Sequence, residues 1–163
     1  MTHVANVKIA SSNVSADLTD YVVYVRLSDL PVEFWNLVAN GGGDIRVYKS
    51  DGTTELAREV VSCDTSTDTG ELHVKFSGTL SSSTDTTIQI HCDGTSSEPA
   101  ATATYGRDNV WSNYEAVYHM EGSGDTLIDS SGNGDATLDM GSSAGDQVSG
   151  GIGNARNFDS GGD

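Results

Sequence analysis

Four oxygen-bearing side chains stand at alternate positions late in the chain, and they could bind a cation. They are Asp129, Ser131, Asn133 and Asp135. Gly134 permits a sharp turn, and this spacing is similar to the first half of a calcium-binding loop. Met140 stands where an EF-hand carries its bidentate Glu, so the loop is not of that type. Two hypotheses fit the pattern: a Ca²⁺ site, or a turn whose Asx side chains hydrogen-bond their own backbone.

A second group of side chains could take part in acid–base chemistry. Glu115, His119 and Glu121 would share one face of a strand that begins at Glu115. A row of carboxylate, imidazole and carboxylate can donate and accept protons. The same pattern is typical of the solvent-facing side of a half-buried strand, and we favour that interpretation. The glycines at 150–153 are followed by no lysine and do not form a phosphate loop. We therefore expect a protein without enzymatic activity.

Aromatic side chains offer a third kind of chemistry, the binding of sugars. Trp111 and Tyr114 are the candidates for contact with a glycan. A structural anchor is the alternative for Trp111 and for Tyr118, because large aromatic rings bury much surface when they fix one segment against another. The anchor is the interpretation that we favour for those two rings.

Charge and hydropathy limit the classes of partner. The 163 residues include 24 acidic and 8 basic side chains, which gives a formal net charge of −16. Such a surface repels phosphates, so we expect no binding to nucleic acid. No apolar run approaches the ~18 residues of a membrane helix, and the first residues have neither the basic nor the apolar region of a secretory signal. We therefore expect a soluble protein that is made in a cytoplasm and does not bind membranes.

The two cysteines, Cys63 and Cys92, fit no metal-binding spacing. Each ends a strand-like segment, so they could lie near each other in a sheet. Two buried, reduced thiols are the favoured interpretation, and a disulfide is the alternative for a protein that matures outside the cell.

The alternation of apolar and polar residues predicts an all-β chain. β-branched and aromatic residues recur in six segments, namely 3–9, 21–27, 44–48, 55–63, 72–76 and 87–92. An Asp-Gly pair at 51–52 predicts a hairpin turn, and Phe34, Leu37 and Val38 predict one helical turn. Short strands with turn signals at regular intervals indicate an antiparallel β-sandwich that ends near Gly94.

Beyond Gly94 the composition changes. Small and polar residues predict a linker over 95–110, and 115–120 is the last strand that we expect. The Gly- and Asp-rich sequence that follows has few apolar side chains. At about 25 cal/mol per Å² of apolar surface, it could not offset its own ordering entropy. We expect it to be held by the first domain, by another subunit or by further residues.

Two family resemblances follow from these segments. Residues 18–94 resemble the uncharacterised β-sandwich domain that precedes laminin-G-like jelly rolls in phage and bacterial surface proteins. The matching pieces are LTDY at 18–21, GDIRV at 43–47, ELHVK at 71–75 and LSSSTDTTIQI at 80–90. Residues 111–159 resemble the start of a laminin-G-like, concanavalin-A-like jelly roll, through Trp111, Tyr114, VYHM at 117–120, DSSGNG at 129–134 and NFD at 157–159.

The resemblance implies a domain organisation. It divides the chain into a β-sandwich over 1–94, a linker over 95–110 and an incomplete, loop-rich jelly-roll segment over 111–163. A whole jelly roll needs two stacked sheets and more residues than follow Trp111. We expect either a longer protein or a short form that completes its sheet through another chain.

The resemblance also implies a function. We expect a non-enzymatic structural protein of a phage virion, such as a capsid-decoration or tail-fibre subunit. Its partners would be other virion proteins and copies of itself, with a trimer as one option. The alternative is a carbohydrate-binding or adhesion module of a larger, extracellular cell-surface protein that contacts a host-surface glycan.

Overall fold

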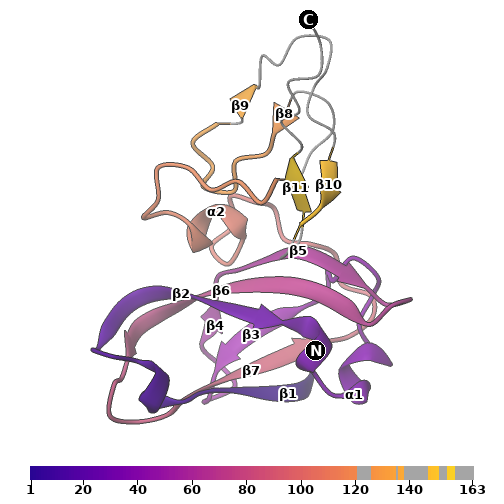
Figure 1. The fold of residues 1–163 in the computed structure, drawn as a ribbon. Helices are drawn as coiled ribbons and strands as arrows, with labels where there is room; N and C mark the ends of the chain where they lie inside the picture. The colour runs from indigo at the N-terminus through magenta and orange to yellow at the C-terminus, as the bar shows by residue number, and fades with distance from the viewer. Residues whose placement is uncertain (121–125, 135, 138–146, 151–153, 157–163) are drawn as a thin grey trace, which may run out of the picture. The chain divides into compact units, whose positions relative to one another are not determined.

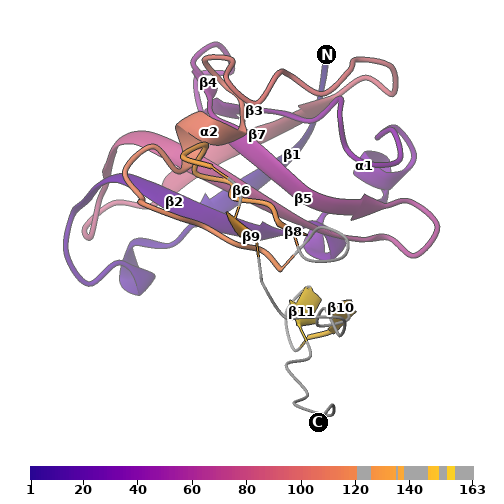
Figure 2. The same cartoon turned by 90° about the horizontal axis from the view of Figure 1, so that it is seen from above.

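The computed structural model describes residues 1–120, 126–134, 136–137, 147–150 and 154–156. It divides the chain into two compact units, Met1–Val110 and Trp111–Asp163. The first unit contains two antiparallel sheets that pack face to face (Figures 1 and 2). Among the described residues, no helix has the length and apolar character to cross a membrane.

Seven strands make up the first unit, and every neighbouring pair is antiparallel. The four-stranded sheet has the order β1 (Thr2–Ile9), β7 (Thr86–Cys92), β3 (Arg46–Lys49) and β4 (Glu55–Leu56). The three-stranded sheet has the order β2 (Leu18–Arg26), β6 (Thr69–Leu80) and β5 (Arg58–Asp64). Short 3-10 turns over Ser11–Asn13 and Leu27–Asp29 follow β1 and β2. The prediction of an all-β antiparallel sandwich is confirmed.

The core lies between the two sheets and follows the alternation of each strand. On β6, Leu72 and Val74 are fully buried, as are Ile88 and Ile90 on β7. Burial of each such side chain contributes roughly 1.5–3 kcal/mol. Helix α1 (Val32–Trp35) confirms the predicted helical turn and adds Phe34 to the same core.

The predicted strand over 55–63 is divided between the sheets. The chain leaves the four-stranded sheet after Leu56 and enters the three-stranded sheet at Arg58. Ala57 stands at the crossing, where its carbonyl oxygen accepts a hydrogen bond from the Lys75 amide at 3.0 Å. This crossing joins the layers and brings Arg58 between them.

Residues 95–110, which we expect to be a linker, form part of the first unit. The Arg58 amide donates to the Tyr105 carbonyl at 3.1 Å, and helix α2 (Arg107–Val110) packs against β5 and β6. Val110 is fully buried, and a Cβ at Gly106 would collide with the Ala100 carbonyl oxygen. These contacts bind residues 95–110, the strap, to the sandwich.

One buried arginine fastens the strap to the sheets. The Arg58 guanidinium donates to the Ile45 carbonyl at 2.9 Å and to the Gly43 carbonyl at 3.1 Å, and it forms an ion pair with Glu98. Its neighbour Arg46 donates to the carbonyls of Gly43 and Ile45 and, at 2.8 Å, to the Ser97 carbonyl of the strap. Arg58 is 1% exposed, so these bonds replace the water that the charge has lost.

Aspartates hold the turns of the first unit. Five of them accept bonds from both a backbone amide and a hydroxyl of Ser or Thr. They are Asp17, Asp51, Asp64, Asp85 and Asp93. The hydrogen bonds lower the pKa of each of these carboxyls, and that of Asp85 falls to about 2, chiefly through its bond with Lys8. These five aspartates therefore have a structural use.

The second unit has short ladders. β8 (Thr126–Leu127) pairs with β9 (Ala136–Thr137), and β10 (Gln147–Ser149) pairs with β11 (Asn154–Arg156). The strand predicted over 115–120 is wrong, since this segment has a single bridge, between Tyr118 and Asp129. The Val117 amide donates its hydrogen bond to the Asp129 carboxylate, so it does not pair with the carbonyl of a neighbouring strand.

Replacement of Arg58 tests its role. We expect Arg58→Met to lower the free energy of unfolding by about 2–4 kcal/mol, because the carbonyls of Ile45 and Gly43 lose a donor inside the protein. Lys8→Gln is the matched control, with a much smaller expected loss, because both side chains of the Lys8–Asp85 ion pair are exposed to solvent. Chemical denaturation measures both, and equal stability of the Arg58 variant and the native chain would contradict the assignment.

Because hydrogen bonds lower the pKa of the turn aspartates, we expect the folded chain to lose stability at acidic pH. The pKa of Asp85 is about 2 in the folded chain, against an ordinary value of 3.8, so its stabilisation is complete above the ordinary value and is lost as the pH falls toward 2. We expect denaturation midpoints in urea to fall over this range, and to fall less in Asp85→Asn. The same pH slope in both proteins would refute this origin.

Candidate functional site

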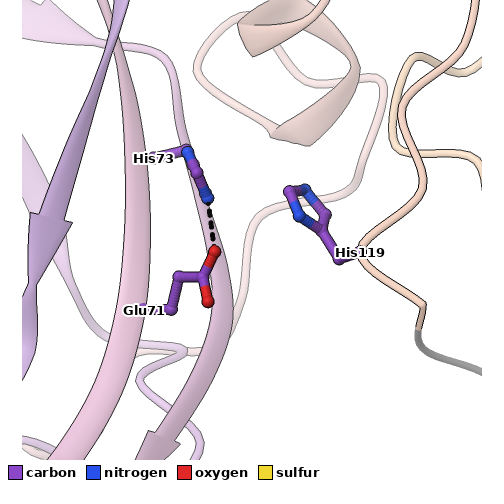
Figure 3. Close-up of side chains that lie close together, drawn as sticks. All are labelled: Glu71, His73 and His119. Atoms are coloured by element: carbon purple, nitrogen blue, oxygen red, sulfur yellow. Dashed lines mark hydrogen bonds and ion pairs between the residues drawn. The ribbon is translucent and has the colours of Figure 1, made fainter. Parts of the chain in front are cut away.

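The outer face of the three-stranded sheet carries a carboxylate–imidazole pair. Leu72 and Val74 face the core, so Glu71 and His73 of β6 face away from it. Glu71 Oε1 lies 2.8 Å from His73 Nε2, and each of the two side chains is 13% exposed (Figure 3). Tyr24 stands directly opposite His73 on β2, with the ring centroids 5.6 Å apart. His119, which Figure 3 also labels, belongs to the second unit.

The chemistry of this pair follows from its neighbours. The Glu71 carboxylate fixes the orientation of the His73 ring through the hydrogen bond between Oε1 and Nε2. Glu59 of β5 stands opposite His73 on the other side and is itself buried. Within the first unit, Glu71 and His73 supply two potential metal ligands that lie together, fewer than the three or four of a zinc site.

Sequence reasoning missed this pair, although a signal was present. In ELHVK the polar residues Glu71, His73 and Lys75 alternate with apolar ones, so a strand must place them on one face. The strand over 72–76 was predicted, but the pairing of Glu71 with His73 on its outer face was not. The contributions of Glu59 and Tyr24 depend on the register of two other strands, which the local pattern does not contain.

The DSSGNG loop of the second unit uses its polar side chains for hydrogen bonds to the chain. Asp129 Oδ1 accepts from the amides of Val117 and Ser131, each at 2.9 Å, and Asp129 Oδ2 accepts from the Ser131 hydroxyl at 2.8 Å. The Asn133 side-chain amide donates to the carbonyls of Tyr114 at 3.2 Å and Glu115 at 3.0 Å. Gly132 has a φ of +79°, which suits the turn.

This geometry contains the hydrogen-bonded turn that the sequence offered as one of two hypotheses. Asp129, Ser131 and Asn133 direct polar atoms to segment 114–117, and Asp129 and Ser131 are buried. Asp135, the fourth member of the predicted Ca²⁺ site, lies outside the described residues. Calcium binding at this loop stays a prediction.

The two aromatic candidates for glycan binding lie edge to face. The ring centroids of Trp111 and Tyr114 are 5.3 Å apart with an interplanar angle of 82°. Trp111 is buried, whereas Tyr114 is 45% exposed. His119 packs near Trp111, with the ring centroids 5.6 Å apart. Of the pair, Tyr114 therefore offers the ring that a sugar could reach.

The predicted acid–base row does not form on a strand. Glu115 and His119 belong to the irregular segment 111–120, and Glu121 lies outside the described residues. The carbonyl of Glu115 accepts bonds from Ser131 and Asn133, so that the backbone of this segment supports the loop.

Three rings form a row on the outer face of the four-stranded sheet. The His91 ring centroid lies 4.7 Å from that of Tyr48 and 5.3 Å from that of His3. Burial lowers the pKa of His91, and the neighbouring His3 lowers it further. His91 Nε2 also lies 3.2 Å from Gln89 Oε1, which gives this surface planar polar groups beside aromatic ones.

The two cysteines are free, buried thiols, Cys63 on β5 and Cys92 on β7. Burial raises the pKa of Cys63 to about 11 and that of Cys92 to about 12, and the Asp44 carboxylate contributes to both shifts. Neither thiol has the low pKa of a nucleophilic cysteine.

Comparison with known proteins gave no match to a family model, to a curated protein or to a solved structure. The family resemblance that we draw from sequence segments therefore stays a prediction.

Replacement of Asp129 separates the two hypotheses for the loop. We expect Asp129→Ala to speed hydrogen exchange of the Val117 and Ser131 amides by about tenfold or more, in EDTA as in calcium, because the lost bonds need no ion. Asp135→Asn is the matched variant. If calcium slows amide exchange in the native chain but not in Asp135→Asn, the loop also binds an ion. If Asp129→Ala leaves the exchange of the Val117 and Ser131 amides unchanged, the assigned hydrogen bonds are wrong.

Proposed function

We propose that this chain is a non-enzymatic structural protein of a phage virion, acting as a capsid-decoration or tail-fibre subunit. The observation that supports the proposal is how the charged side chains are used. Five aspartates hold turns, and Arg58 holds the strap, so these charges serve rigidity. A small sandwich with fastened loops and an acidic surface suits a subunit that must stay folded and soluble on a crowded particle.

The partners follow from the same proposal. They are other virion proteins and copies of this chain, with a trimer as one option, and the location is the virion. The resemblance of 18–94 to a domain common in phage and bacterial surface proteins supports this context. It is an argument from association with a fold, rather than from the chemistry of a site.

A carbohydrate-binding or adhesion module, exposed outside the cell, is the second candidate. Two observations favour it: the half-exposed ring of Tyr114 beside Trp111, and the row of Tyr48, His91 and His3. Planar polar groups next to aromatic rings are the chemistry that a host-surface glycan would need.

Particle analysis tests the virion role. We expect the chain to copurify with phage particles from its native source, and intact-mass measurement of the particle proteins identifies it there, alone or within a longer polypeptide. Its absence from particles of a phage whose genome encodes it would refute the virion role.

A glycan array distinguishes the second candidate. We expect no saturable binding to host-surface polysaccharides by the purified chain. Binding that Tyr114→Ala abolishes, while Tyr105→Ala leaves it intact, would favour the adhesion module, because Tyr105 is also exposed but lies in the first unit.

A further inference from the structure

Asparagine or aspartate is followed directly by glycine at four places in the chain. The pairs are Asn40 with Gly41, Asp51 with Gly52, Asp93 with Gly94, and Asn133 with Gly134. Such a pair can react with itself, because glycine has no side chain to hinder the approach of its amide nitrogen to the preceding side-chain carbonyl carbon. The product is a five-membered imide, which water opens to aspartate or isoaspartate. Whether a folded chain permits this reaction depends on the hydrogen bonds of the reacting groups.

The Asn40 pair is held at both of its reacting groups. The Gly41 amide donates to the Cys63 carbonyl at 2.8 Å. Asn40 Oδ1 accepts a hydrogen bond from the Thr65 amide at 3.1 Å. The nitrogen and the side chain are thus bound to another segment, and they cannot meet until these bonds open. The hydrogen bonds therefore protect Asn40, although the residue is exposed.

The two aspartate pairs of the first unit are protected in the same manner. The Gly52 amide donates to the Lys49 carbonyl at 3.0 Å, and the Gly94 amide donates to Asp44 Oδ2 at 2.6 Å. The carboxylates that precede these glycines also accept hydrogen bonds within their own turns. In the first unit, all three glycine amides of these pairs are therefore occupied.

The Asn133 pair lacks these restraints. No described residue accepts a hydrogen bond from the Gly134 amide, and both residues of the pair are exposed. Outside its chain neighbours, a Cβ at Gly134 would meet no atom within 4 Å, so the site has room to move. The hydrogen bonds of the Asn133 side chain come from Nδ2 and lie at the surface, where water competes for them. The Gly134 nitrogen can therefore reach the Asn133 side chain once these exposed bonds open.

We propose that Asn133 is a site of spontaneous modification, at which the folded chain converts this asparagine to aspartate and isoaspartate. The Gly134 nitrogen attacks Cγ of Asn133, the new N–Cγ bond replaces the Cγ–Nδ2 bond, and ammonia leaves with the proton of the Gly134 amide. Water then adds to one of the two carbonyls of the imide and opens the ring. The reaction needs no partner other than water, so it is independent of the proposed virion role.

The conversion removes a support of the loop at 129–134. Asn133 Nδ2 donates to the carbonyls of Tyr114 at 3.2 Å and Glu115 at 3.0 Å, and this nitrogen is the atom that leaves as ammonia. The product carries a carboxylate, which accepts hydrogen bonds but cannot donate them, so the two carbonyls lose their donor and face a negative charge. The loop then opens more often from segment 114–117, and the change has no return step.

Peptide mass spectrometry of the full native chain tests the site. The chain is incubated at mildly alkaline pH, where the glycine amide loses its proton more readily, and the replacement of –NH₂ by –OH is followed at each asparagine. We expect Asn133 to convert about tenfold faster than Asn40 or more, because Asn40 reacts only after its hydrogen bonds open. Conversion of Asn40 at the same rate as Asn133 would overturn the inference.

The same chain in concentrated urea is the reference for intrinsic reactivity. Neither glycine amide is held there, so Asn40 and Asn133 should convert at rates within about threefold of each other. A chain in which Asn133 converts in urea but not in the folded state would show that the loop protects this pair, and the proposal would be wrong.

Hydrogen exchange tests the consequence for the loop. The Ser130 amide donates to the Val117 carbonyl at 2.8 Å across the same contact, and we expect incubation to speed its exchange by about threefold or more. Asn133→Gln is the matched variant, since glutamine keeps an amide donor but forms its larger imide ring far more slowly. If incubation speeds exchange equally in the native chain and in Asn133→Gln, the loosening does not come from Asn133.

Discussion

The buried guanidinium of Arg58 is the interaction on which the architecture of the first unit depends. A charge without water is costly unless hydrogen bonds and a counter-charge replace the solvent. Here the partners are the loop before β3, through Gly43 and Ile45, and the strap, through Glu98. Burial lowers the pKa of Arg58 and the bond with Glu98 opposes that shift, so the group keeps its charge at neutral pH. Because Arg58 directly follows the crossing at Ala57, its bonds fix the place where the chain changes sheet.

Asp44 is the acidic counterpart in the same loop. Its fully buried carboxylate accepts hydrogen bonds from the amides of Ala39, Asp93 and Gly94. The loop between α1 and β3 is therefore joined to the end of β7, where the strap begins. This carboxylate and the Arg58 guanidinium thus replace the backbone pairing that a loop cannot make for itself. The exposed aspartate turns apply the same principle with a carboxylate, an amide and a hydroxyl, at positions where water competes.

Local patterns in the sequence predicted local structure, and they did not contain what depends on distant residues. The sandwich followed from alternation, but nothing in 55–63 indicates which sheet each half joins. Residues 95–104 are small and polar, which predicts a linker, yet the strap is held by Arg58 from another part of the chain. The turn at 129–134 was one of two hypotheses, and the sequence indicates only its local bonds, such as those from Ser131 to Asp129, whereas its bonds to segment 114–117 join distant positions. The Glu71–His73 pair could be predicted from its spacing. Its neighbours Glu59 and Tyr24 could not, because the register of their strands is set by the whole sheet.

The described parts of the two units satisfy their backbone in different ways, and this difference accounts for the polar composition of the loop at 129–134. In the first unit the backbone groups pair in long ladders, such as that between β2 and β6. In the second, the described ladders are two or three residues long, and side chains act in place of a neighbouring strand. Asp129 accepts the Val117 amide as a strand carbonyl would, while Ser131 and Asn133 donate to the Glu115 carbonyl as strand amides would. A side chain that replaces a strand must be short and carry oxygen or an amide, and it must alternate with residues that turn the chain. The run of Asp, Ser, Asn and Gly at 129–134 meets each of these conditions, so its composition follows from backbone pairing.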